Sequence, residues 1–246
     1  MKPYKNRTYR SLVSENKLAN FRVVVKETDL FVRADRPLET ETRDLVLKHR
    51  LPLERYLEQH PGFVHALRPL PQDQLAPPIV KTMIAAGHKA GVGPMAGVAG
   101  AIAEYVGRDL LAYSQNVIVE NGGDIFIRTD FPLIAAIFAG KSPLSNKVGV
   151  RIDSPGCPIS VCTSSGTLGH SLSLGRADAA VVISGSTALA DAVATAIGNE
   201  VSSKQDIQPA IELGKNIEGV LGLVIILDNE IGLWGNVELV RISGGR

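Results

Sequence analysis

The sequence has no excess of either charge and no apolar run long enough to cross a membrane. Its 246 residues include 26 basic and 25 acidic side chains, for a net charge of +1. A chain without a basic excess lacks the field that holds a polyanion nonspecifically, so nucleic-acid binding is not expected. The longest apolar runs, at 133–139 and 220–227, fall far below the roughly 18 residues of a membrane-spanning helix. We interpret them as buried strands and expect no membrane contact.

Cysteine is scarce. Cys157 and Cys162 are the two cysteines of the chain, and they flank Pro158 closely enough to close a small disulfide loop. Two thiols without a second pair cannot complete a zinc site. The N-terminal MKPYKNRTYR is basic, but the following SLVSENKLAN is too polar for the apolar section of a secretory signal. We therefore expect a cytoplasmic protein with two reduced thiols.

Apolar residues make up 45% of the chain, which is enough to bury a sizeable core in one large domain or in two intimately packed halves. The runs FRVVVKE and DLFVRAD, joined at Thr28-Asp29, alternate in polarity and predict an antiparallel hairpin. The segment from Leu38 to His60 has the pattern of an amphipathic helix that is broken or restarted at Pro52.

Alanine and glycine dominate the chain from Ile79 onward. Gly93-Pro94 predicts a helix start, because proline at the first helical position loses no hydrogen bond. Gly97 and Gly100 would let a backbone or a ligand approach this helix closely. Two interpretations stay open: tight packing of the helix on a sheet, or an anion bound by free N–H groups of the turn at 91–94.

The remaining patterns predict an antiparallel sheet with further helices. NVIVENGGDIFIR, from Asn116 to Arg128, indicates two strands joined by a tight turn. The other expected elements are strands at 133–139, 147–152 and 159–162, a helix from about Ser186 to Gly198-Asn199, a short helix at 207–213, and closing strands around an Asp228-Asn229 turn. The second small-residue helix resembles the first, which suggests an internal duplication.

The stretch from Val161 to Thr195 holds the residues that are best suited to ligand binding or catalysis. Thr163, Ser164, Ser165 and Gly166 offer hydroxyls and backbone N–H groups that suit diphosphate oxygens. Asp191 and Thr195 are four residues apart on one helix face, so they can present two hard oxygens to one magnesium ion. The alternative for this pair is a solvated face or a local side-chain bond. His170 has a side chain that can exchange a proton near neutral pH, or hydrogen-bond a ribose or the sheet backbone.

The segments ENGGDIFI, CTSSGTLGHS and ADAVATAIGN, in this order, resemble the uncharacterised ApbE-like protein family, which is distantly related to ApbE, the FAD:protein FMN transferase. The likeness to that small family also covers KETDLFV and GVGPMAGVAGAIAE, whereas the likeness to ApbE itself is confined to about Gly93 to Gly198. It implies an α+β fold: a T-fold-like, ApbE-type two-layer arrangement in which two related halves, divided near residue 140, pack helices on antiparallel sheet. A pairing of two copies into a homodimer is also implied.

The resemblance assigns roles residue by residue. Asn121, Gly122, Gly123 and Asp124 are similar to the glycine turn that lies against the dinucleotide, and Thr163, Ser164, Ser165 and Gly166 to the segment near the phosphates. His170 resembles the histidine that follows, a candidate catalytic residue, and Asp191 and Thr195 resemble the Asp and Thr of a magnesium site. The implied cofactors are Mg²⁺ and FAD or another nucleotide diphosphate.

Two departures from the ApbE pattern affect the expected function. ApbE proteins carry a lysine where this chain has Gly97-Val98-Ala99-Gly100, and an aspartate run after the histidine where this chain has Ser171 to Gly175. We therefore expect Mg²⁺-dependent binding of a flavin or another nucleotide diphosphate, with flavin transfer to a protein partner as the implied activity. The alternative is a noncatalytic accessory protein of sulfur assimilation, or sulfide-dependent homocysteine formation, that keeps a vestigial pocket.

Overall fold

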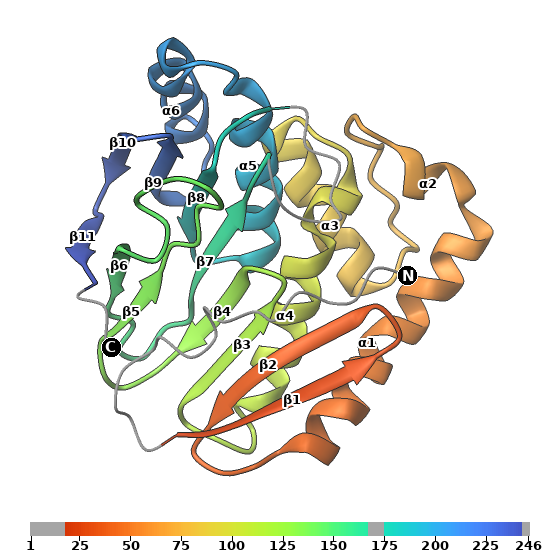
Figure 1. Ribbon diagram of the computed structural model, residues 1–246. Helices are drawn as coiled ribbons and strands as arrows, with labels where there is room; N and C mark the ends of the chain where they lie inside the picture. The colour runs from red at the N-terminus through yellow and green to blue at the C-terminus, as the bar shows by residue number, and fades with distance from the viewer. Residues whose placement is uncertain (1–17, 167–174, 243–246) are drawn as a thin grey trace.

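The computed structural model of the chain describes residues 18–166 and 175–242 and has one large antiparallel sheet at its centre (Figure 1). Its eight strands are arranged in the order β1-β2-β3-β4-β7-β8-β9-β10, and every neighbouring pair is antiparallel. The strands are β1 (Ala19–Val25), β2 (Thr28–Ala34), β3 (Val117–Asn121), β4 (Asp124–Arg128), β7 (Ile159–Ser164), β8 (Ala179–Ser184), β9 (Val220–Leu227) and β10 (Glu230–Gly235).

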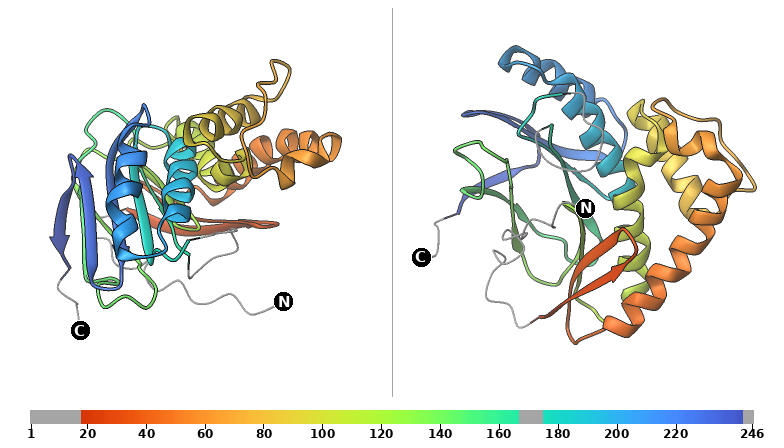
Figure 2. Two further views of the ribbon diagram at one scale, coloured as in Figure 1. Left: turned by 90° about the horizontal axis from the view of Figure 1, so that it is seen from above. Right: turned by 45° about the vertical axis from the view of Figure 1, so that its right-hand side comes forward.

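Helices cover one face of this sheet (Figure 2). They are α1 (Glu39–Gln59), α2 (Pro61–His65), α3 (Pro78–Ala90), the 3₁₀ helix η2 (Pro94–Gly97), α4 (Val98–Leu110), α5 (Thr187–Glu200), η3 (Lys204–Asp206) and α6 (Ile207–Lys215). Helix α4 packs on β3 and β4, α5 packs on β7 and β8, and α6 packs on β9 and β10. The expected α+β class, with helices on antiparallel sheet, is confirmed.

A second sheet covers part of the opposite face. It contains β5 (Leu133–Ala136), β6 (Val148–Ile152) and β11 (Glu238–Arg241) in the order β11-β6-β5. Apolar side chains of this sheet, such as Val150 and Ile152, form a second core with Ile127, Val181 and Val224 of the large sheet. This layer adds to the expected two, because an antiparallel sheet whose far face is also apolar needs a cover on both sides.

The large sheet repeats one arrangement. Strands β1 and β2 are followed by helices and then by β3 and β4, and strands β7 and β8 are followed by helices and then by β9 and β10. The two units join where β4 pairs with β7, and the segment between these strands carries β5 and β6. This repeat agrees with the expected duplication, while the division near residue 140 stays a prediction. Helices α4 and α5 lie against each other on the two sides of the join.

Most local predictions are confirmed, and three of the differences have a clear physical reason. The first hairpin turns at Lys26, which has a positive φ of 51°, rather than at Thr28-Asp29. Helix α1 continues through Pro52 without a break. Pro52 is exposed, so water can hydrate the carbonyl that loses its hydrogen bond. Helix α5 passes Gly198, which is buried against β7 and β8 side chains, and ends at Glu200.

The structure also describes the state of the two thiols and the apolarity of the helices. Cys157 and Cys162 are both free, the first exposed and the second buried, as expected for reduced thiols. Among the helices of the described residues, none combines the length and apolarity that crossing a membrane requires.

Candidate functional site

Helices α4 and α5 touch backbone to backbone at two glycines of α4 and its leading turn. A Cβ on Gly100 would lie 2.4 Å from the carbonyl oxygen of Thr187 and 2.8 Å from Cβ of Asp191. A Cβ on Gly97 would lie 2.8 Å from the carbonyl oxygen of Ala188. Gly97 and Gly100 therefore serve close packing, but against helix α5 rather than against the sheet that was expected. This packing brings Asp191 to the first turn of α4.

Asp191 lies in the second turn of α5, and its carboxylate faces the start of α4. Its Oδ2 atom accepts a hydrogen bond of 2.8 Å from the N–H of Gly100, and the N–H of Ala99 also donates to this carboxylate. The N-cap of α4 is Gly97, which has no side chain to accept these groups. Asp191 thus supplies, from a second helix, the acceptor that an N-cap side chain would provide.

The hairpin turn between β3 and β4 closes the site from another side. Gly122 and Gly123 have φ angles of 72° and 116°, which glycine adopts without strain. The side-chain amide of Asn121 donates a 3.0 Å hydrogen bond to the carbonyl of Ala99, so the turn is tied to the same end of α4. Among the residues that the structure describes, no heavy atom lies within 4 Å of a Cβ built on Gly122, so they leave this face of the turn uncovered.

Asp124, the first residue of β4, is buried beside Asp191. Burial and then the nearby charge of Asp191 raise the pKa of Asp124 well above its ordinary value, although hydrogen bonds from Cys162 and the Thr163 backbone act in the opposite direction. Burial also raises the pKa of Asp191 to about 7, against the effect of the N–H groups of Gly100 and Ala99. Two carboxyl groups so placed hold a proton at neutral pH more readily than two isolated ones.

The carboxyl pair fits a hard divalent cation. Within residues 18–166 and 175–242, neither Asp124 nor Asp191 forms an ion pair with a basic side chain. A cation would supply the missing positive charge, and carboxylate oxygens are the ligands that Mg²⁺ prefers. Across the same described residues, no group of three or more His, Cys, Asp or Glu side chains is arranged to hold a metal. The protein would therefore hold Mg²⁺ through few ligands, as it does where phosphates and water complete the coordination.

Two more predicted residues lie along α5. Thr195 is one turn beyond Asp191 on the same helix face and is partly buried. The Oγ atom of Ser164, at the end of β7, lies 3.7 Å from a Cβ built on Gly198 in the last turns of α5. Asp191, Thr195 and Ser164 thus follow one side of the helix in this order.

The predicted run of hydroxyls is not a single phosphate loop. Thr163 and Ser164 belong to β7 and pair with β8, and side chains of a strand alternate between its faces. Cys162 lies on the helix side, so Thr163 points to the opposite side and Ser164 to the helix side. The N–H of Gly166 donates to the carbonyl of Ala177 at 2.9 Å, which removes it from the donors expected for a phosphate. Ser165 follows the strand directly, and its role stays a prediction.

His170, the predicted catalytic residue, lies outside the described residues. The described residues on either side of it, Gly166 and Gly175, approach each other closely: a Cβ on Gly166 would lie 2.2 Å from the carbonyl oxygen of Gly175. The role of His170 stays a prediction.

The sequence also allowed an anion site at the turn of residues 91–94, and this prediction is wrong. The N–H groups of Gly91 and Val92 both donate to the carbonyl of Gly87. The N–H of Gly93 donates to the carbonyl of Leu67 at 3.0 Å. These donors are used within the fold because the turn packs against the segment after α2, where a Cβ on Gly93 would overlap the carbonyl of Ala66.

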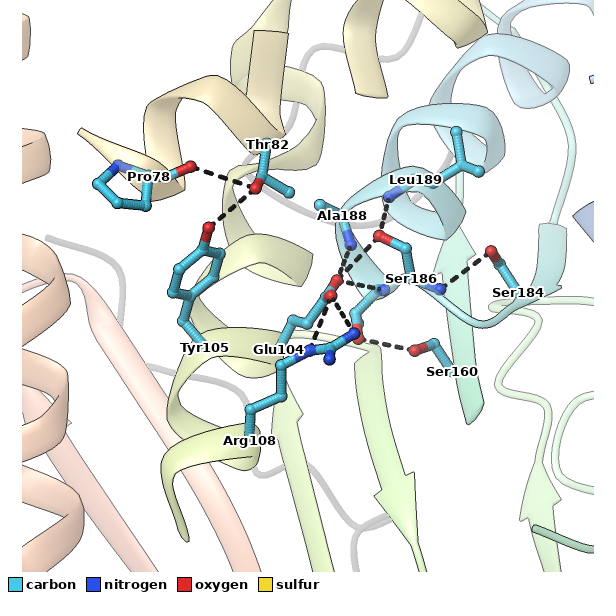
Figure 3. A network of polar contacts seen from close by, with 11 residues as sticks. Pro78, Thr82, Glu104, Tyr105, Arg108, Ser160, Ser184, Ser186, Ala188 and Leu189 are labelled. Atoms are coloured by element: carbon cyan, nitrogen blue, oxygen red, sulfur yellow. Dashed lines mark hydrogen bonds and ion pairs between the residues drawn. The ribbon is translucent and has the colours of Figure 1, made fainter. Parts of the chain in front are cut away.

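One carboxylate at the helix crossing was not predicted. Glu104 of α4 is buried and accepts hydrogen bonds from the start of α5 (Figure 3). It is the one charged residue between Gly91 and Gly107, and this isolation within an alanine- and glycine-rich helix is the signal that could have identified it. Glu104 and Asp191 thus have matching positions, because each of the two helices places a carboxylate at the first turn of the other.

Solved structures share the fold. The chain is similar to a flavinyl transferase ApbE from Pseudomonas stutzeri in its apo form, with 15% identity, a TM-score of 0.52, and coverage of 89% of this chain and 94% of the other. It is also similar to a variant of the flavin transferase ApbE from Vibrio cholerae, with 12% identity, a TM-score of 0.55, and coverage of 89% and 97%. At such identities the likeness establishes the fold and leaves the chemistry open.

Closer relatives match in sequence. A UPF0280 protein of Methanocaldococcus jannaschii is 39% identical over 227 residues, covering 89% of this chain and 92% of the relative. A UPF0280 protein of Methanopyrus kandleri is 39% identical over 235 residues, covering 92% and 95%. The family model described as AbpE bacteria matches residues 10–232. The chain therefore belongs to this family, the ApbE-like UPF0280 proteins.

Proposed function

We propose that this protein binds the diphosphate of a flavin nucleotide, or of another nucleotide, through a divalent cation held by Asp191. The observation that carries the proposal is the buried carboxyl group of Asp124 beside the partly buried carboxyl group of Asp191, a pair that no basic side chain offsets in the part of the chain that the structure describes. Such a pair is costly without a counter-charge. A cation that bridges it to phosphate oxygens removes this cost.

Three side chains of the protein would hold the cation. Asp191 and Thr195 offer a carboxylate and a hydroxyl from one helix face, and Asp124 offers a second carboxylate from the sheet. The open face of the Gly122-Gly123 turn leaves room for a flat or extended part of the ligand beside α4. When bound, Mg²⁺ supplies the positive charge that offsets the phosphates.

The choice of a flavin nucleotide rests on the family and on the fold. The solved neighbours are named flavin transferases, and the diphosphate of FAD has the charge that a cation at Asp191 would meet. Transfer is the second part of the proposal: an acceptor hydroxyl loses its proton and bonds to the FMN phosphorus, while the diphosphate bond breaks and AMP leaves. His170 is the residue predicted to take that proton.

Calorimetry tests binding directly. Titration of FAD, FMN and ATP into the protein should give heat with Mg²⁺ and none with EDTA. If none of the three binds in a magnesium-dependent way, the proposal is removed. Release of AMP from FAD in the presence of a hydroxyl-bearing acceptor protein tests transfer separately, with the His170→Ala variant as the comparison.

The accessory-protein alternative predicts a different result. A protein with a vestigial pocket would give neither magnesium-dependent binding nor AMP. Cys162 offers no support for sulfur chemistry, since burial and the nearby Asp124 raise the pKa of its thiol well above the ordinary value and a thiol that keeps its proton is a poor nucleophile.

A further inference from the structure

We propose that Glu104 is a positioning residue for the cation site: it holds the start of α5 against α4 and thereby sets where the Asp191 carboxylate lies. The inference rests on the proposed function for its effect on ligand binding, but its structural part can be tested without a ligand. Glu104 is 6% exposed, and it lies on the same face of α4 as Gly100, one turn away.

The contacts of Glu104 show how it acts on α5. Its Oε2 atom accepts hydrogen bonds from the N–H of Thr187 at 2.7 Å, the N–H of Ala188 at 3.2 Å and the hydroxyl of Ser186 at 2.9 Å (Figure 3). These groups form the N-cap and first turn of α5. A carboxylate at a helix N-terminus meets both the free N–H groups and the positive end of the helix dipole.

The Oε1 atom of Glu104 is held by its own helix. Arg108 donates from Nε at 3.1 Å and from Nη2 at 2.9 Å. Because Arg108 is one turn further along α4, it fixes the side chain of Glu104 and balances its charge. Glu104 therefore has no vacant acceptor to offer a metal or a ligand, and its function is mechanical.

The position of Asp191 follows from this attachment. Thr187 and Asp191 are four residues apart on one face of α5, and both meet Gly100 of α4. The start of α5 is also attached to the sheet, where the hydroxyls of Thr187 and Ser160 lie 2.7 Å apart. If the carboxylate of Glu104 is removed, the hydrogen bonds of the start of α5 to the sheet remain, but its side-chain hydrogen bonds to Glu104 of α4 are lost. Asp191 is then less firmly held against Ala99 and Gly100.

Amide hydrogen exchange of Ala99 and Gly100 measures this displacement without a ligand, because in α4 these two N–H groups are bonded to the Asp191 carboxylate. In Glu104→Ala we expect their exchange to accelerate about tenfold or more. Glu104→Gln keeps an acceptor oxygen of the same reach, so exchange should stay near that of the wild type. Glu104→Asp keeps the charge but shortens the side chain, and serves if the alanine variant fails to fold.

Asp206→Ala is the matched control. Asp206 is another carboxylate that accepts N–H groups at a helix start, those of Ser202 and Ser203, and it belongs to η3 rather than to the α4–α5 contact. This variant should lose stability without faster exchange at Ala99 and Gly100.

Mg²⁺-dependent binding of FAD gives the second readout. Glu104→Ala should weaken it about tenfold or more, and Glu104→Gln by no more than about threefold, as expected when a ligand is misplaced rather than removed. If exchange and affinity of Glu104→Ala match those of Asp206→Ala, Glu104 is an ordinary cap and the inference is overturned. If the wild type binds no nucleotide while Glu104→Ala still exposes Ala99 and Gly100, the proposed function fails and the positioning role stands.

Discussion

Glu104 and Asp191 both lie where α4 and α5 cross, and each accepts N–H groups at the start of the other helix. Their surroundings differ. Glu104 accepts three hydrogen bonds from the start of α5 and two from Arg108. Asp191 accepts backbone N–H groups of Ala99 and Gly100 and lies beside the buried Asp124. One carboxylate thus has its charge balanced by an arginine, while the other faces a second acid.

This difference distinguishes a carboxylate that completes the fold from one that suits a site. A buried carboxylate with an arginine and several donors is satisfied within the chain. A buried pair of acids is not, and it must hold a proton or gain a cation. Burial raises the pKa of both aspartates, and the charge of Asp191 raises that of Asp124 further. Capping a helix therefore does not tell a structural carboxylate from one that suits a cation site. The presence or absence of a nearby basic side chain does.

The largest effect should follow from removing Asp191. Asp191→Ala takes away the α5 carboxylate that lies beside Asp124, so we expect magnesium-dependent FAD affinity to fall about a hundredfold or more, or about 2.8 kcal/mol. Isothermal titration calorimetry at pH 8 measures this loss. Asp206→Ala, which removes a capping carboxylate elsewhere, should bind as the wild type does. Unchanged affinity in Asp191→Ala would make Asp191 a cap like Glu104.

The second prediction concerns pH in the absence of divalent cations. Asp191 titrates at about 7 in the folded protein against an ordinary value of 3.8, so the folded state binds its proton more tightly than the unfolded state does. The stability from this proton is fully present below about pH 4 and is lost as pH rises through about 7. Asp191→Asn keeps an oxygen for the N–H of Gly100 but cannot ionise.

Urea unfolding in EDTA checks this prediction across that pH range. The free energy of unfolding of the wild type, minus that of Asp191→Asn, should fall by about 2.4 kcal/mol between pH 4 and pH 6. A difference that stays flat with pH would mean that Asp191 is compensated as well as Glu104 is, and the contrast between the two carboxylates would disappear.

Local sequence patterns predicted the elements that carry the site better than they predicted the site. The Asn121 to Asp124 turn, the strands around it and the start of α5 at Ser186 follow from turn and capping chemistry that acts over a few residues. The contact of Gly100 with Asp191 spans 91 residues, and no short pattern encodes it. The assignment of Asp191 to a metal site came from its spacing to Thr195 and from the family resemblance, whereas its capping of α4 required the fold.

Glu104 and the hydroxyl run illustrate the two ways in which pattern reasoning was incomplete. The partners of Glu104 are some 80 residues away on α5, so its role depends on helix packing that composition only suggests. Thr163 and Ser164 have the composition of a phosphate loop, yet they are the end of β7. Their alternation between the two faces of the sheet becomes visible only once the strand pairing is known.

The third prediction tests the contact that both carboxylates need. In Gly100→Ala the added Cβ would lie 2.4 Å from the carbonyl oxygen of Thr187, so α4 and α5 must separate. Such overpacking costs about 1–3 kcal/mol, and the better helix propensity of alanine offsets up to about 1 kcal/mol of it. We expect the free energy of unfolding, measured in urea, to fall by about 1.5 kcal/mol. FAD should bind more slowly or more weakly. Gly62→Ala, where a Cβ meets open space, is the control for an added methyl group.

The smallest expected effect comes from Thr195, and it separates the two uses of α5. Thr195→Val replaces the hydroxyl with a methyl group of similar volume, so the packing of α5 should be kept while one neutral oxygen is lost. A hydroxyl contributes less to Mg²⁺ binding than a carboxylate does, and water can take its place in the coordination shell. We expect magnesium-dependent FAD affinity to fall about threefold to fivefold, or about 0.7–1 kcal/mol, with no faster exchange at Ala99 or Gly100, since the Asp191 carboxylate would keep its place. If Thr195→Val instead exposes those amides while affinity is unchanged, Thr195 supports the helix contact, and the cation depends on Asp191 and Asp124 alone.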